Sequence, residues 1–135
     1  MPTKGTLNGI ARVHLVAAEL SLRGFSVAVT ARNTEGVDLY ASSPKTSRTY
    51  SIQAKTSASQ KRNYFWPVGR KPVSPNRNLI YVFVNIYRDR VPALTEFYVV
   101  PSKVVADHQS SPGMDFNSFH KRHAPQPRYS WNQFR

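Results

Sequence analysis

Three side chains that could act together in phosphodiester chemistry stand on two short segments of this sequence. Asp38 lies in residues 36–40, and Gln53 and Lys55 lie in residues 51–56. Both segments are typical of strands, in which residues two apart point to the same side. If the two strands are neighbours, a carboxylate, an amide oxygen and an ammonium converge. Metal-dependent hydrolysis of a phosphodiester uses such a grouping.

A simpler interpretation of the same residues is the solvent-facing side of an antiparallel sheet. Such sheets commonly alternate between buried apolar and exposed polar side chains. The Gln-x-Lys spacing alone leaves both interpretations open, so the rest of the chain has to decide between them.

Charge is the strongest signal in the composition. The chain has 19 Lys and Arg against 7 Asp and Glu, which gives a net charge of +12. This excess attracts polyanions and makes nucleic acid the expected partner. An acidic protein or an anionic membrane surface would also suit the charge, but no basic amphipathic helix favours a membrane.

Length and cysteine content narrow the classes further. The 135 residues suit a single domain with its own core, and the absence of cysteine excludes disulfides and thiolate metal sites. No apolar run approaches the ~20 residues that span a bilayer. We therefore expect no membrane partner and a cytoplasmic location.

A helix is predicted over residues 8–23, where apolar residues recur every three or four positions and Gly24 follows as a stop signal. Glu19 lies inside this helix. It could form an exposed ion pair with Arg23, four residues later. It could equally direct its carboxylate toward the neighbouring strands, and the pattern does not choose between the two.

The remaining pattern predicts strands followed by short helices. Strands are expected at residues 25–30, 37–41, 49–56, 79–86 and 96–100. A short helix is expected at 103–108 after Ser102 as a cap, and another at 115–123. The tail, 124–135, contains Trp131, which we expect to anchor it on the domain.

Between the third and fourth of these strands, the basic and Pro-rich loop 58–78 shows no clear periodicity. Basic residues interleaved with the aromatic triplet 64–66 would suit phosphate contacts and base stacking. Alternatively, the aromatics pin the loop onto the core, which we favour for Trp66. The basic residues expected to bind nucleic acid are Lys61, Arg62, Arg70, Lys71 and Arg77.

The order of these segments resembles the PD-(D/E)XK, or restriction-endonuclease-like, nuclease superfamily. The Gln-x-Lys form is similar to its Mrr-like branch, and the likeness covers roughly residues 8–105. The residues that carry it are Leu15-Val16-Ala17-Ala18-Glu19-Leu20, Arg23-Gly24-Phe25, Gly36-Val37-Asp38-Leu39, Gln53-Ala54-Lys55-Thr56-Ser57 and Phe97-Tyr98-Val99-Val100-Pro101-Ser102.

The resemblance implies a role for each site residue. Asp38 would be the principal ligand of a divalent metal, Mg²⁺ or Mn²⁺, with further oxygens from the Gln53 side chain and the Ala54 carbonyl. Glu19 would hold a bound water or a second metal. Lys55 would position the attacking water and stabilise charge on the phosphate.

The expected fold and function follow from this resemblance. The fold would be α/β, with a restriction-endonuclease-like core in which an N-terminal helix precedes a mixed, mainly antiparallel central sheet of about five strands, flanked by C-terminal helices. Residues 1–135 would form a single nuclease-like domain. The chain would be a metal-dependent endonuclease that hydrolyses phosphodiester bonds in DNA. The resemblance also allows a homodimer. The alternatives are a catalytically inactive nucleic-acid-binding module and, third, a basic protein paired with an acidic partner.

Overall fold

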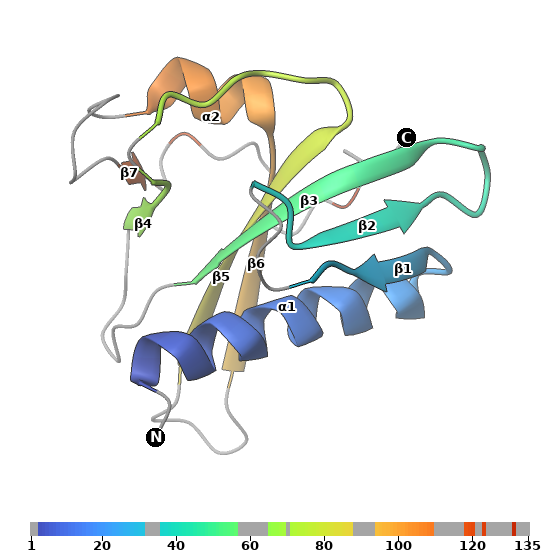
Figure 1. Ribbon diagram of the computed structural model, residues 1–135, viewed down its shortest axis with the longest axis horizontal. Helices are drawn as coiled ribbons and strands as arrows, with labels where there is room; N and C mark the ends of the chain where they lie inside the picture. Colours follow the sequence, from blue (N-terminus) through green and yellow to red (C-terminus); the bar gives the residue numbers. More distant parts are fainter. Residues whose placement is uncertain are drawn as a thin grey trace.

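The computed structural model of the chain describes residues 3–31, 36–56, 65–69, 71–87, 94–109, 118–120, 123 and 131. Its elements are α1 (Lys4–Leu22), β1 (Ser26–Val29), β2 (Leu39–Ser42), β3 (Thr49–Thr56), β4 (Phe65–Pro67), β5 (Leu79–Tyr87), β6 (Leu94–Pro101), α2 (Ser102–His108) and β7 (Ser118–His120). Figure 1 shows α1 on one side of a twisted sheet and α2, β4 and β7 on the other.

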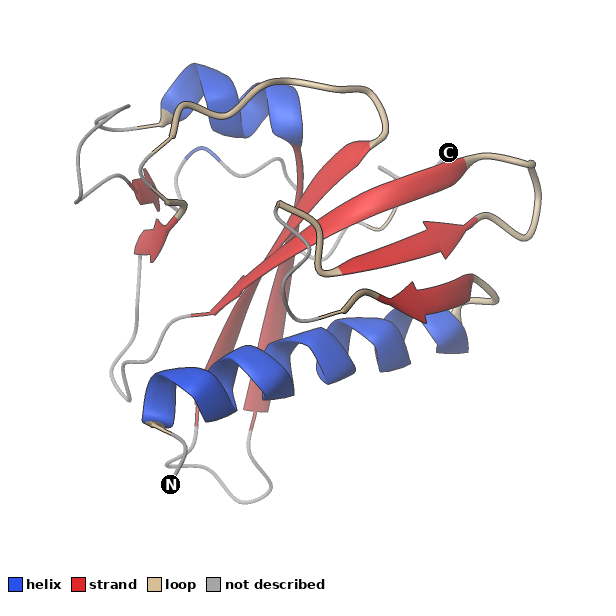
Figure 2. Ribbon diagram, in the orientation of Figure 1, coloured by secondary structure: helices blue, strands red, loops and turns tan. Residues whose placement is uncertain are grey.

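The central sheet has the strand order β1-β2-β3-β5-β6. β3 and β5 run parallel, whereas the other neighbouring pairs are antiparallel. This confirms the predicted α/β class and the mixed, mainly antiparallel sheet of five strands. Parallel neighbours need a long crossover connection, and here the chain between β3 and β5 passes through β4 on its way (Figure 2).

The helix α1 begins four residues earlier than the apolar pattern predicts. Thr3 caps it, because the Thr3 hydroxyl oxygen accepts a hydrogen bond from the backbone N–H of Thr6 at 3.1 Å. The helix ends before Gly24, whose φ of 91° lies in the left-handed region that glycine tolerates. The extra turn, Lys4–Leu7, has one large apolar residue, Leu7, so hydrophobic periodicity did not predict it.

The core on the α1 side holds the helix against the sheet. Val16 and Leu20 of α1 are fully buried together with Ile52 of β3 and Val82 of β5. Fully burying a side chain of this kind stabilises the fold by about 1.5–3 kcal/mol. The C-terminal half of α1 is therefore the part that fixes its position.

The core on the other side is aromatic. Trp66 of β4 is fully buried, with its ring 4.9 Å from Phe83 and 5.2 Å from Tyr98. Its indole N–H donates to the carbonyl oxygen of Val84 at 3.3 Å. The interpretation that Trp66 pins its loop onto the core is thus confirmed.

The helix predicted at residues 115–123 is wrong for residues 118–120, which form β7. This strand pairs antiparallel with β4, and Phe119 lies opposite Trp66. Phe119 is fully buried and stacks on Phe83 at 4.8 Å. Burial of one aromatic against the sheet outweighs the weak helical spacing of this segment. The helix predicted at 103–108 is confirmed as α2, but Ser102 is its first residue and not its cap, because the Ser102 hydroxyl is hydrogen-bonded to the backbone of Asn76.

Two further features complete the fold. The tail residue Trp131 packs against Phe97, with ring centres 5.7 Å apart, and the guanidinium of Arg23 lies 4.9 Å from its ring. Neither helix in the described part of the chain is long and apolar enough to cross a membrane.

Candidate active site

The sheet opens along the second half of β3. β2 pairs with β3 only as far as Ile52, whereas β5 pairs with β3 up to Thr56. In the described part of the chain, residues 53–56 therefore have a strand neighbour on one edge only. We call this place the β3 opening, and both Gln53 and Lys55 lie in it.

Asp38 lies where β2 separates from β3 and closes part of this gap. Its carboxylate oxygen Oδ2 accepts a hydrogen bond from the backbone N–H of Ala54 at 2.8 Å. Its own N–H donates to the carbonyl oxygen of Ile52 at 2.8 Å. Its carbonyl oxygen accepts from the hydroxyl of Thr30 at 2.9 Å. The same carbonyl oxygen also accepts from the backbone N–H of Thr30 at 3.0 Å, so four hydrogen bonds fix Asp38 at the β3 opening.

The ammonium of Lys55 is close enough to the carboxylate of Asp38 for the two charges to interact. Burial lowers the pKa of Lys55 below the usual 10.5, the charge of Arg12 lowers it further, and the charge of Asp38 partly offsets both. All three charged groups are therefore near enough to influence one another. A partly desolvated ammonium interacts strongly with an anion that reaches it.

Gln53 contributes an oxygen to the same stretch of β3. Its side-chain Oε1 is sealed from solvent and has no hydrogen-bond partner within the residues that the structure describes. A buried amide oxygen without a partner is costly, by about 1–3 kcal/mol. A cation or a donor from a ligand would remove that cost.

Arg12 is the site residue that sequence reasoning missed. Asn8, Arg12, Val16 and Leu20 follow each other at intervals of four along α1, and the last two face the core. Asn8 is also buried, at 5% exposure, so this row of α1 is polar toward the N-terminus and apolar toward the C-terminus. Following the same interval of four from Val16 toward the N-terminus leads to Arg12 and Asn8, so the sequence held a signal for both polar residues.

Glu19 takes a different position from the one that the resemblance implies. Its carboxylate lies 3.8 Å from the guanidinium of Arg23, and both side chains are partly exposed. It stands seven residues after Arg12, which is about 10 Å along the helix axis. Among the described residues, it does not line the cavity next to Asp38.

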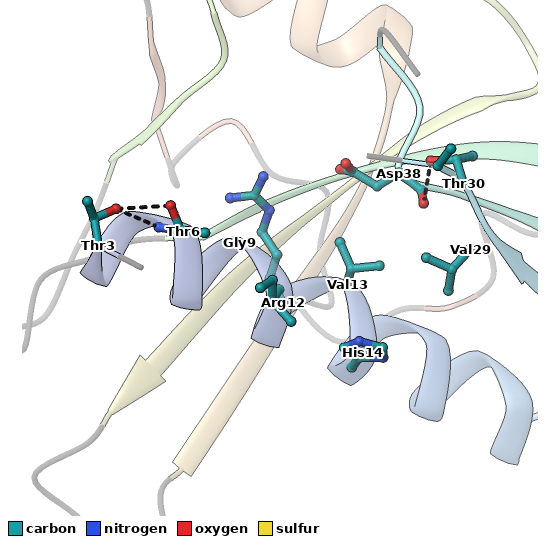
Figure 3. Close-up of a pocket in the computed structure, with 11 residues that line it drawn as sticks. Thr3, Thr6, Gly9, Arg12, Val13, His14, Val29, Thr30 and Asp38 are labelled. Carbon is teal, nitrogen blue, oxygen red and sulfur yellow. Dashed lines mark hydrogen bonds between the residues drawn. The ribbon is translucent and has the colours of Figure 1, made fainter. Parts of the chain in front are cut away.

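That cavity lies between α1, the end of β1 and Asp38. Its volume is about 780 Å³. Figure 3 shows the guanidinium of Arg12 reaching from α1 toward the side of the cavity where the carboxylate of Asp38 lies. The described lining residues are Thr3, Thr6, Gly9, Ile10, Arg12, Val13, His14, Val29, Thr30, Ala31 and Asp38.

The basic residues of loop 58–78 lie only partly within the described structure. Lys61, Arg62 and Arg70 fall outside the described residues. Lys71 and Arg77 are exposed. The carbonyl oxygen of Arg77 accepts a hydrogen bond from the guanidinium of Arg48 at 3.1 Å. The carbonyl oxygen of Asn78 accepts one from the backbone N–H of Ser51, near the start of β3. Arg77 is therefore at the opposite end of β3 from Lys55.

The donor set at the β3 opening fits a weakly held magnesium ion. The Asp38 carboxylate and the unpartnered Oε1 of Gln53 are oxygen groups of the kind that magnesium prefers, and the Ala54 backbone N–H donates to Oδ2 of Asp38. Within the described residues, no three His, Asp or Glu side chains gather as a metal site. Magnesium commonly uses one or two protein ligands and takes the rest from water and substrate phosphate.

Comparisons of the chain with protein-family models, curated proteins and solved structures found no match.

Proposed function

We propose that this chain is a magnesium-dependent nuclease of the PD-(D/E)XK type that hydrolyses phosphodiester bonds in DNA. The proposal is carried by one observation. Asp38 comes from the segment before β2 and is bonded at 2.8 Å to the backbone between Gln53 and Lys55 on β3. This bond brings the carboxylate of Asp38 to the stretch of β3 that carries Gln53 and Lys55, which supports the proposal.

Each residue has a role that its environment supports. Asp38 and Gln53 would hold the metal through their side-chain oxygens, and Lys55 would donate to an oxygen of the scissile phosphate. When bound, the magnesium ion lowers the pKa of a water and neutralises charge on the phosphate. We leave Glu19 out of this site because its carboxylate faces Arg23.

The overall charge supports a polyanionic substrate. A net charge of +12 draws DNA to the chain and makes binding strongly dependent on salt. Arg12 and Lys55 extend this positive charge into the β3 opening, where a phosphate would lie between two cations. DNA rather than RNA, and a possible homodimer, come from the family resemblance.

Arg12 also favours a second candidate function, which is nucleic-acid binding without cleavage. A guanidinium near Asp38 repels a divalent cation, and the site offers a single carboxylate for the metal. In that case the chain would bind DNA equally well with and without magnesium. The two functions differ in their response to the metal rather than in their affinity for DNA.

The deciding experiment measures cleavage of supercoiled and linear DNA with magnesium, with manganese and with EDTA. We expect metal-dependent cleavage that falls at least about 100-fold in Lys55→Ala, because a transition-state contact is lost. Asp38→Asn should also lose cleavage, since it removes the charge but keeps an oxygen that can accept from Ala54. Lys45→Ala is the control, because it removes the same charge from the exposed turn between β2 and β3.

Two results would separate the candidates. Cleavage by Lys55→Ala at the parent's rate would show that the activity comes from elsewhere. No cleavage by any variant, together with salt-sensitive binding that ignores magnesium and survives Asp38→Asn, would establish the binding module instead.

A further inference from the structure

The cavity beside Asp38 has apolar walls as well as charged groups. Ile10 of α1 and Val29 of β1 line it, and they are 45% and 50% exposed. They come from two different elements. Large aliphatic side chains gain stability when a ligand covers them, so these walls suit a flat, apolar group.

Charged side chains also line the cavity, next to its apolar walls. Arg12 and Asp38 both line it, so a guanidinium and a carboxylate belong to the same cavity. The Nε atom of Arg12 is sealed from solvent and has no hydrogen-bond partner among the described residues. A guanidinium with a donor left over is well suited to bind a phosphate.

We propose that this cavity holds one unpaired nucleotide of a nucleic-acid strand, with its phosphate on the guanidinium of Arg12 and its base against Ile10 and Val29. The inference rests on the proposed function and names its substrate class. The volume of about 780 Å³ lies within the range of small-molecule sites.

The physical consequence is a preference for unpaired nucleic acid. A base that is stacked inside a duplex cannot enter a cavity between a helix and a strand unless it first leaves the stack, which costs a few kcal/mol. Single strands, frayed ends and flaps do not carry this cost. Phosphate contacts alone would not produce this preference, because the denser phosphates of a duplex attract a basic protein at least as strongly as those of a single strand.

The test measures binding of three fluorescent DNA probes in EDTA, so that cleavage plays no part. The probes are a short single strand, a blunt duplex of that sequence and a single strand in which abasic sites replace the bases. We expect the single strand to bind at least about fivefold more tightly than the abasic strand, since one base contact is worth 1 kcal/mol or more.

Substitutions in the apolar walls of the cavity test whether the preference for the normal strand arises there. Ile10→Ser and Val29→Ser should abolish the advantage of the normal strand over the abasic strand and leave duplex binding unchanged. Both positions are exposed, so the fold should tolerate the changes. Leu22→Ser is the matched control, because Leu22 is 84% exposed at the far end of α1. Arg12→Gln should weaken binding of all three probes.

The outcomes separate this inference from the proposed function. Equal binding of normal and abasic strands, or an unchanged preference in Ile10→Ser and Val29→Ser, would overturn the nucleotide site even if the protein cleaves DNA. A preference that these variants abolish, in a protein that never cleaves, would support the nucleotide site and reject the nuclease.

Discussion

The carboxylate of Asp38 accepts a hydrogen bond from the backbone N–H of Ala54 at 2.8 Å, across the point where β2 and β3 separate. The carboxylate thus replaces the backbone acceptor that a continuing β2 would have supplied. This bond has a structural role in addition to any chemical one. Its loss should therefore be visible in stability as well as in activity.

We expect Asp38→Ala to lower the free energy of unfolding by about 1–3 kcal/mol, because the N–H of Ala54 loses its partner. Asp38→Asn should cost less, since its amide oxygen can still accept the bond. Urea unfolding followed by tryptophan fluorescence measures both. Parent-like stability of Asp38→Ala would mean that water replaces the carboxylate at no cost.

Lys55 should destabilise the fold at neutral pH. Burial lowers its pKa in the folded chain below 10.5. Below the folded pKa both states are protonated and the folded chain carries the full cost of the buried charge. Between the two pKa values the unfolded chain binds more protons, so stability rises with pH.

Lys55→Met removes this cost. We expect the variant to unfold at higher urea concentration than the parent at pH 7, with an advantage that shrinks as the pH rises toward 10.5. Urea unfolding at several pH values tests the change. A less stable variant at pH 7 would show that the contact with Asp38 outweighs the burial.

Glu19→Gln should leave DNA cleavage unchanged and lower the free energy of unfolding by only about 0.2–0.5 kcal/mol, as expected for an exposed i,i+4 pair. The measurement pairs a cleavage assay with urea unfolding. Arg23→Gln breaks the same ion pair from the other side but also removes the guanidinium from the Trp131 ring, so it should cost more stability than Glu19→Gln. A cleavage loss confined to Glu19→Gln would return this carboxylate to the site.

Tyr87 should make the fold sensitive to alkali. Burial and the hydrogen bond from its hydroxyl to Oε1 of Glu96, at 2.6 Å, raise its pKa to about 12. The unfolded chain loses this proton near 10.0, so it binds fewer protons than the folded chain between these values. Stability should therefore fall as the pH rises from 10 to 12.

Tyr87→Phe tests this because it cannot ionise. We expect a shallower alkaline decline than in the parent, and a loss of about 1 kcal/mol at pH 7 from the missing hydrogen bond. Urea unfolding at pH 7, 9 and 11 provides the comparison. Identical alkaline slopes for the two proteins would assign the decline to other tyrosines.

Trp66→Ala should lower the free energy of unfolding by about 3–5 kcal/mol, because it empties a fully buried position in the aromatic core. Thermal unfolding followed by far-UV circular dichroism measures it. The exposed change Leu22→Ala serves as control. If both variants melt together with the parent, Trp66 does not hold the β4–β7 pair against the sheet.

The sheet could be predicted well because its strands carry clear patterns. β3 alternates along its length and has the predicted bounds, Thr49–Thr56. β5 is almost wholly apolar because sheet neighbours and both cores surround it. β4 and β7 could not be predicted, since each has three residues and acquires its structure only by pairing with the other.

The site could be predicted only where it lies on strands. The two-residue spacing placed Gln53 and Lys55 correctly on one side of β3, because strand geometry is local. Which charged residue of α1 faces the β3 opening depends on the rotation and tilt of the helix, which packing of Val16 and Leu20 sets. The family resemblance pointed to Glu19, and Arg12 was therefore missed.

The helix α1 runs without a break from Lys4 to Leu22, so a shift of its C-terminal half would also shift its N-terminal half. Leu20 is seated in the core, and Arg12 lies eight residues away, about 12 Å along the axis. If a smaller residue replaced Leu20 and the helix rotated, the guanidinium of Arg12 would be displaced although no charged residue had been changed. Substitutions in the apolar core can thus change the position of a charged group in a cavity that they do not contact.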